Sequence, residues 1–177
     1  SQSNGFVAWM PRRSELYTLS SPQTYTFLAN NSWMNLLAIH EYRHIAQQEL
    51  ILSKAFFKKI QTNVGELFSS FFAFLYMPSW YFEGDAIITE STASNYGRGR
   101  EASFTRLARI NAIEYPQFSY QKQILGSYKQ PIPDHYSTGY IILNYLKNTY
   151  GTAAYNAVIN NTFNTTKHIK PLNKTLK

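Results

Sequence analysis

The order of apolar and polar positions changes character about thirty residues into the chain. Before that point, short apolar or alternating runs at 6–10, 15–19 and 24–28 are separated by Gly, Pro and Ser. Alternation with a period of two, bounded by turn-forming residues, is typical of β-strands. We therefore expect two or three short strands within residues 1–30.

A helical pattern begins after residue 30. Asn31 or Ser32 is a candidate N-cap, and apolar positions then recur at helical spacing to about Thr62. A second apolar stretch, 67–77, ends before Pro78 and is too short to span a bilayer. We expect this stretch to be a buried core helix, with contact to a membrane surface as the alternative.

The rest of the pattern predicts four more helices, separated by Gly and Pro. Their expected ranges are 80–95, 101–114, 134–150 and 152–163. Asp134 is the candidate N-cap of the third, and Gly151 separates the last two. The expected fold class is α+β: a small N-terminal β-sheet in residues 1–30, then a mainly helical body over 31–177.

Length and composition are those of one folded domain. The chain has 177 residues, of which 44% are hydrophobic and 15% are charged. Such a chain can bury a substantial core and is not typical of disordered proteins. It begins at Ser1 without a signal peptide and ends without a clear helix cap, as an excised piece of a longer protein would. We therefore expect one domain over 1–177, with other domains of a longer chain as partners.

Charge and cysteine content exclude several classes of function. The net charge is +7, and four lysines without an acid lie in the last eleven residues, which leaves +3 elsewhere (7 − 4). That distribution indicates no nucleic-acid partner. The chain has no cysteine, so a disulfide framework and a thiolate metal site are excluded. Any metal must be held by nitrogen and oxygen ligands.

The most informative pattern is His40-Glu41-Tyr42-Arg43-His44, which has the form H-E-x-x-H. Side chains four positions apart project from the same face of a helix, so the two imidazoles could bind one metal ion. The glutamate between them could then act as general base on a water at that ion. The alternative is a pair of helix histidines that make local hydrogen bonds.

A hydrolytic zinc site needs three protein ligands and an open fourth position. The extended pattern H-E-x-x-H-x-x-G-x-x-H is not met, because Gln47 and Leu50 stand where its glycine and third histidine belong. A glutamate on a later helix is the remaining solution. Residues 80–90 read W-Y-F-E-G-D-A-I-I-T-E and offer Glu83 and Glu90.

Together with H-E-x-x-H, this W-x-x-E-G-x-A-x-x-x-E segment resembles the gluzincin metallopeptidases, which include thermolysin and the aminopeptidase-N-like enzymes. The resemblance is closest to the peptidase-MA-like branch and covers about residues 30–150. It implies a zincin catalytic core like that of thermolysin.

By motif match, the resemblance implies that His40, His44 and Glu83 bind Zn²⁺ and that Glu41 is the general base. Glu90 would be a second carboxylate that hydrogen-bonds a ligand histidine. The alternatives are a capping or surface carboxylate for Glu83 and a solvated helix residue for Glu90.

A further match lies at Tyr136-Ser137-Thr138-Gly139, which resembles the Y-x-x-G helix start of the aminopeptidase-N-like enzymes. The resemblance implies that the Tyr136 hydroxyl steadies the oxyanion of the tetrahedral intermediate, a task that suits a neutral donor. His135 is a rival for this role. On a helix the two side chains would point about 100° apart, so we expect only one to face the metal. A core tyrosine is the alternative.

Two arginines flank Gly99 just beyond the segment that carries Glu83. Arg98 and Arg100 could bind an anion, or they could anchor the loop near a helix start. The sequence leaves both interpretations open.

The sequence thus predicts a zinc metallopeptidase that acts on a peptide or protein. We expect an endopeptidase, because no G-x-M-E-N segment that would grip a free amine occurs in the first thirty residues. The alternative is a catalytically weak or inactive gluzincin-like binding or scaffold module of a larger cell-envelope protein. Hydrolysis of a non-peptide amide or ester is a third possibility. The expected location is periplasmic, cell-envelope or secreted, and no transmembrane segment is expected in this piece.

Overall fold

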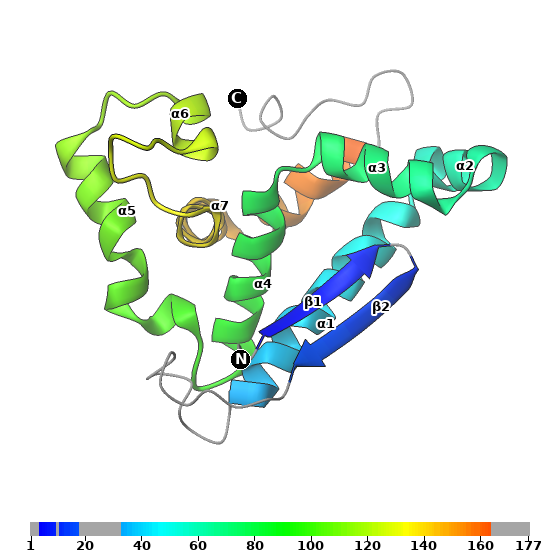
Figure 1. The fold of residues 1–177 in the computed structure, drawn as a ribbon, viewed down its shortest axis with the longest axis horizontal. Coiled ribbons are helices and arrows are strands. Elements are labelled where there is room, and N and C mark those ends of the chain that lie inside the picture. The colour runs from blue at the N-terminus through cyan, green and yellow to red at the C-terminus, as the bar shows by residue number, and fades with distance from the viewer. Residues whose placement is uncertain (1–3, 10, 18–32, 164–177) are drawn as a thin grey trace. The chain divides into compact units, whose positions relative to one another are not determined.

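The computed structural model describes residues 4–9, 11–17 and 33–163, which are mainly helical with one small antiparallel sheet (Figure 1). This confirms the broad α+β prediction. The chain divides into two compact units. Unit 1 takes in the described residues up to 78 and from 156 onward, and unit 2 is residues 79–155. That residues 1–177 form one domain stays a prediction.

The N-terminal strands form a hairpin in unit 1. β1 (Asn4–Trp9) pairs antiparallel with β2 (Arg12–Tyr17), in a register that runs from Asn4 opposite Tyr17 to Trp9 opposite Arg12. Both strands begin two or three residues earlier than the apolar runs predicted, because the paired residues include polar ones such as Arg13 and Ser14. The third predicted strand, 24–28, lies outside the described residues.

The helix predicted to run to about Thr62 is in fact two helices, so that prediction is wrong. α1 (Trp33–Leu52) ends at an irregular turn, and α2 (Ala55–Val64) follows. Lys54 has extended backbone angles, and the Ser53 hydroxyl donates a hydrogen bond to the Leu50 carbonyl at 2.7 Å. Such local side-chain bonds compete with helix continuation, whereas apolar spacing carries on across the break. The two candidate N-caps of α1 lie outside the described residues.

α3 (Glu66–Tyr76) forms where it was predicted, but several of its large apolar side chains face solvent. Four of its large apolar side chains are exposed: Leu67, Phe68, Phe71 and Leu75. The side chains buried on its inner face are small: Ser69, Ser70 and Ala73. The expectation of a buried core helix is therefore wrong for these four residues, whereas Met77, at the end of the predicted stretch, is buried. A segment that is apolar nearly all round does not specify which face turns inward. Among the described helices, none combines the length and apolar character needed to cross a bilayer.

Unit 2 is helical throughout its described elements. These are α4 (Ser79–Ala93), the short 3₁₀ helix η1 (Arg98–Arg100), α5 (Ala102–Glu114), α6 (Tyr120–Leu125) and the first part of α7 (His135–Phe163). The short α6 lies in the segment predicted as a loop. Its N-cap is Ser119, whose hydroxyl accepts the Lys122 N–H at 3.3 Å.

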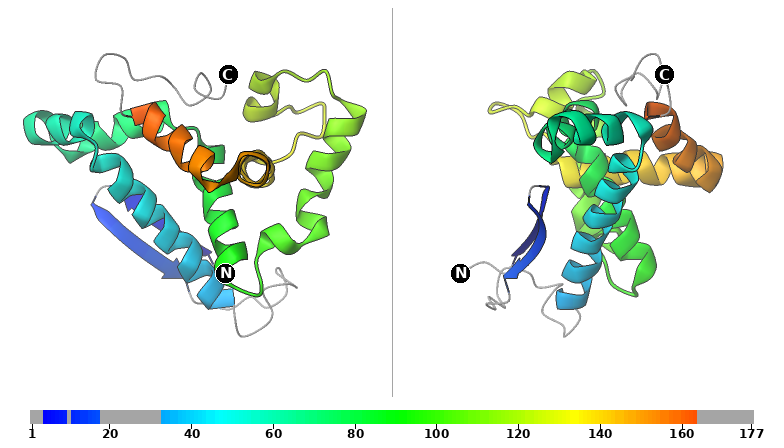
Figure 2. Two further views of the ribbon diagram at one scale, coloured as in Figure 1. Left: turned by 180° about the vertical axis from the view of Figure 1, so that it is seen from behind. Right: turned by 90° about the vertical axis from the view of Figure 1, so that its right-hand side faces the viewer.

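Both predicted signals in α7 are confirmed. Asp134 caps the helix, since its Oδ1 accepts the backbone N–H and the hydroxyl of Ser137, each at 2.8 Å. Gly151 interrupts the helix with φ 81° and ψ 172°. Only glycine adopts this region without strain, so the helix changes direction there (Figure 2).

α4 and α7 cross at a pair of glycines in unit 2. A Cβ on Gly84 would lie 2.6 Å from both the Gly139 carbonyl oxygen and the Tyr140 nitrogen. A Cβ on Gly139 would collide with the Trp80 carbonyl oxygen. The two helix backbones therefore touch at the glycines of the E-G-x-A and Y-x-x-G segments. This contact places Glu83, next to Gly84, near the helix turn that carries Tyr136.

Candidate metal site

The two histidines of α1 converge one helical turn apart. Their Nε2 atoms are 3.2 Å from each other, and the ring planes are nearly perpendicular, at 88°. Two nitrogens about 2.0–2.1 Å from one tetrahedral ion would be separated by about 3.3 Å. His40 is buried and His44 is partly exposed. The pair is thus spaced as two ligands of a single ion would be.

Gln47 fixes the orientation of His44. Its Oε1 lies 2.9 Å from the Nδ1 of His44, three positions back along the helix. An amide oxygen only accepts hydrogen bonds, so this contact selects the tautomer with the proton on Nδ1, which leaves the lone pair of Nε2 for a metal. Gln47 is buried, and it occupies the position where the extended histidine motif would have glycine. From the sequence, Gln47 served only to exclude the extended histidine motif. Its position at i+3 from His44 was the available signal.

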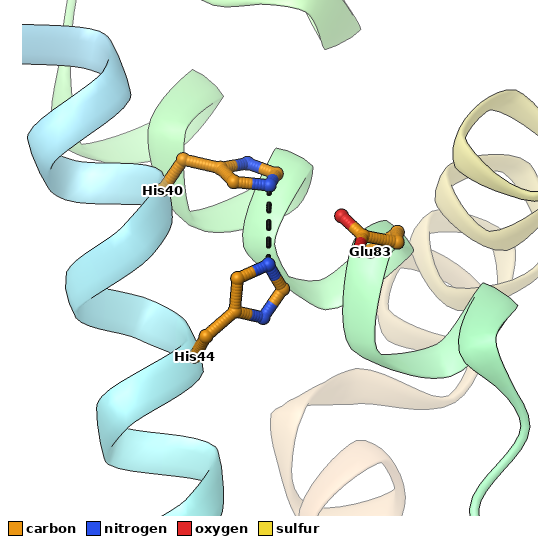
Figure 3. Close-up of side chains that lie close together, drawn as sticks. All are labelled: His40, His44 and Glu83. Carbon is orange, nitrogen blue, oxygen red and sulfur yellow. Dashed lines mark hydrogen bonds between the residues drawn. The ribbon is translucent and has the colours of Figure 1, made fainter. Parts of the chain in front are cut away.

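Glu83 of α4 joins the two histidines. His40, His44 and Glu83 each offer a ligand atom, and these atoms all lie within 4.8 Å of one another (Figure 3). In the part of the chain that the structure describes, this is a group that could hold a metal ion. Two imidazole nitrogens and one carboxylate oxygen are a ligand set found in hydrolytic zinc sites, where a fourth position is left open.

Glu41 is buried on α1 beside strand β1. Gly5 of this strand lies against it, since a Cβ added to Gly5 would lie 3.1 Å from the Glu41 Oε1 and 3.0 Å from its Cγ. The missing side chain of Gly5 therefore leaves room for the carboxylate. Sequence reasoning did not single out Gly5, because only the packing of the strand on α1 shows why glycine is needed there.

Glu90 is buried on α4, and its two oxygens hold Arg98. The Oε1 accepts the Arg98 backbone N–H at 3.0 Å and Nε at 2.9 Å, and Oε2 accepts a terminal guanidinium nitrogen at 2.9 Å. Burial acts to lower the pKa of Arg98, but the hydrogen bond and charge of Glu90, with smaller contributions from Tyr136 and Glu83, raise it overall. Arg98 therefore keeps its positive charge beside this carboxylate. A hydrogen bond from a ligand histidine to Glu90 stays a prediction.

The two arginines after α4 both hold the loop to that helix. Arg98 does so through Glu90, and Arg100 donates from Nε to the Ser91 carbonyl at 2.9 Å. Of the two interpretations left open by the sequence, loop anchoring is the one that these contacts show. The loop is tightly built, since the Gly99 N–H also donates to the Ser91 hydroxyl at 3.0 Å.

Tyr136 and His135 begin α7 side by side. Their ring centroids are 4.4 Å apart and their ring planes differ by 33°, so the two rings lie against each other. That only one of them faces the metal stays a prediction. His135 is exposed and Tyr136 is partly buried. The guanidinium carbon of Arg98 lies 5.4 Å from the centre of the Tyr136 ring. Tyr136, and not His135, is thus the residue shown to pack against the Arg98 that Glu90 holds.

Comparison of the chain with protein-family models, curated proteins and solved structures found no match.

Proposed function

We propose that this chain is a zinc metallopeptidase of the gluzincin type, with a catalytic core like that of thermolysin. The observation that carries the proposal is the convergence of His40, His44 and Glu83. The hydrogen bond that the His44 Nδ1 donates to the Gln47 Oε1 supports it, because in that tautomer the Nε2 of His44 is unprotonated and can bind a metal. The ligand set and the H-E-x-x-H spacing favour Zn²⁺ over a hard, all-oxygen ion such as Mg²⁺.

The residues of the site have distinct tasks in peptide hydrolysis. A bound zinc ion would supply Lewis acidity toward the substrate carbonyl and the attacking water. Glu41 takes a proton from that water and passes it to the leaving amine. Tyr136 donates a hydrogen bond to the carbonyl oxygen as negative charge develops there. His135 is the alternative donor.

The substrate class we propose is a peptide or protein cleaved internally. The free-amine-binding segment of aminopeptidases has no counterpart in the first thirty residues. A site in the periplasm, in the cell envelope or outside the cell fits the proposal, as part of a longer chain.

A binding or scaffold module with weak or no catalysis is the second candidate. The observation that favours it is the apolar surface of α3, where Phe71 and Leu75 are more than half exposed, at 56% and 61%. Exposed apolar stripes of this kind often mark interaction surfaces. The two candidates differ in whether an intact metal site is accompanied by peptide cleavage.

The deciding experiment compares Glu41→Gln with the wild-type chain. We expect the variant to keep about one zinc per chain by atomic absorption and to cleave a broad peptide mixture at least ~100-fold more slowly, since it loses the proton carrier but no ligand. Glu49→Gln is the matched control, because Glu49 lies on the same helix with its side chain 71% exposed. It should cleave at the wild-type rate.

Two outcomes would count against the proposal. Full activity of Glu41→Gln would contradict the mechanism. Zinc in the wild-type chain, lost in His44→Ala, without cleavage of any peptide would favour the binding module.

A further inference from the structure

We propose that Arg98 is a positioning residue for the reaction, which holds the Tyr136 ring in place by linking it to the buried carboxylate of Glu90. The inference rests on the proposed function, in which Tyr136 donates to the oxyanion. It assigns a catalytic purpose to an ion pair that otherwise looks like a loop anchor.

The guanidinium group of Arg98 contacts both Glu90 and the Tyr136 ring. Its Nε and one terminal nitrogen engage the two oxygens of Glu90, each at 2.9 Å, in the two-pronged geometry that guanidinium groups form with carboxylates. Its guanidinium carbon is 5.4 Å from the centre of the Tyr136 ring, within the range of cation–π attraction. Because Glu90 holds the Arg98 guanidinium in place, the guanidinium can in turn hold the Tyr136 ring in place.

The backbone that carries Arg98 is also fixed from two helices of unit 2. Ser91 of α4 accepts the Gly99 N–H at 3.0 Å through its hydroxyl and the Arg100 Nε at 2.9 Å through its carbonyl. From α7, the Tyr140 hydroxyl donates to the Gly99 carbonyl at 2.8 Å. Arg98 thus has little freedom to move relative to either helix.

Helix geometry puts these contacts on the faces that carry the proposed site residues. Glu90 follows Glu83 by seven positions, which is two turns on the same face of α4. Tyr140 follows Tyr136 by four positions, which is one turn on the same face of α7. Arg98 therefore joins the functional face of α4 to that of α7.

A fixed positive charge beside Tyr136 also suits its proposed role. As the phenol strengthens its hydrogen bond to a developing oxyanion, negative charge on its oxygen grows, and a nearby guanidinium stabilises that charge. Because Glu90 keeps Arg98 ionised, the cation is present before the reaction begins. Stabilisation of this kind needs no rearrangement during the reaction.

A double-mutant cycle tests whether Arg98 acts through Tyr136. We expect Arg98→Met to lower kcat roughly 10- to 100-fold with KM and zinc content unchanged, as misplacement of a catalytic group does. In a Tyr136→Phe background, the same change should cost less than about twofold, because the ring remains but the hydroxyl that Arg98 helps to place is already gone. Arg98→Lys should recover part of the loss, since it keeps the charge but lacks the fork. Arg109→Met, which removes an exposed arginine of α5, should have no effect.

A second measurement does not depend on activity. With ¹³C-labelled tyrosine, the signal of Tyr136 is assigned by its loss in Tyr136→Phe, and we expect it to shift in Arg98→Met but not in Arg109→Met. An unmoved signal, additive losses in the cycle, or loss of zinc from Arg98→Met would each overturn the inference. If the wild-type chain cleaves no peptide while the Tyr136 signal still shifts in Arg98→Met, the proposed function fails. The contact between Arg98 and Tyr136 is then structural only, and the catalytic role of Arg98 fails as well.

Discussion

At the scale of single residues, three buried carboxylates each need a compensating partner. Glu41, Asp85 and Glu90 are each no more than 5% exposed. Burying a charge is costly unless hydrogen bonds or an opposite charge compensate. Glu90 has Arg98, and Asp85 accepts a hydrogen bond from the Tyr155 hydroxyl. Each of these partners should therefore matter more for stability than an exposed residue of the same type.

Tyr155→Phe tests this at Asp85. The variant keeps the ring and removes only the donor, so we expect the free energy of unfolding in urea to fall by about 1–3 kcal/mol. Tyr145→Phe is the control, since Tyr145 lies on the same helix and is 62% exposed. It should change stability by less than about 0.5 kcal/mol. Equal effects of the two changes would show that the buried hydrogen bond contributes nothing special.

At the scale of elements, the contact between α4 and α7 sets the geometry of unit 2. Ten residues of α4 are buried, so this helix is surrounded on nearly all sides and cannot shift without repacking. Its closest neighbour at Gly84 is the backbone of α7 at Gly139. Because backbone atoms cannot rotate away as side chains do, this crossing tolerates no added atoms.

Gly84→Ala should therefore be strongly destabilising. We expect a loss of about 1–3 kcal/mol or more in the free energy of unfolding, because the added methyl group forces two helix backbones apart. Gly126→Ala is a useful comparison, since nothing lies within 4 Å of its added Cβ and its cost comes from a φ of 77° alone. If Gly84→Ala melted like the wild-type chain, the close approach of α4 and α7 would be wrong.

At the scale of the whole molecule, metal binding should be linked to folding. The proposed ligands His40 and His44 are separated from Glu83 by about forty residues of chain, so an unfolded chain does not present them together. A ligand that binds only the folded state stabilises it by mass action.

We accordingly expect zinc to raise Tm and EDTA to lower it. Zinc at a hundredfold excess over its Kd would add about 2.7 kcal/mol of stability. Differential scanning calorimetry with and without zinc measures the shift, and Glu83→Gln should reduce it. A Tm that zinc leaves unchanged in the wild-type chain would contradict metal binding by the folded protein.

Local chemistry was predictable from the sequence because it depends on near neighbours. Helical spacing placed His40 and His44 on one face of a helix, and the capping role of Asp134 and the interruption at Gly151 follow from single residues. The break between α1 and α2 was missed, since the apolar spacing continues across Ser53 and Lys54, where the backbone leaves the helix.

What lies far apart in the chain was decided by tertiary structure alone. The sequence offered Glu83 through a resemblance, but only folding shows that its carboxylate lies near the two imidazoles. The contact of Arg98 with Tyr136, the glycine crossing and the outward apolar face of α3 have no local signal either. Periodicity states which residues share a face of a helix, whereas packing decides what that face meets.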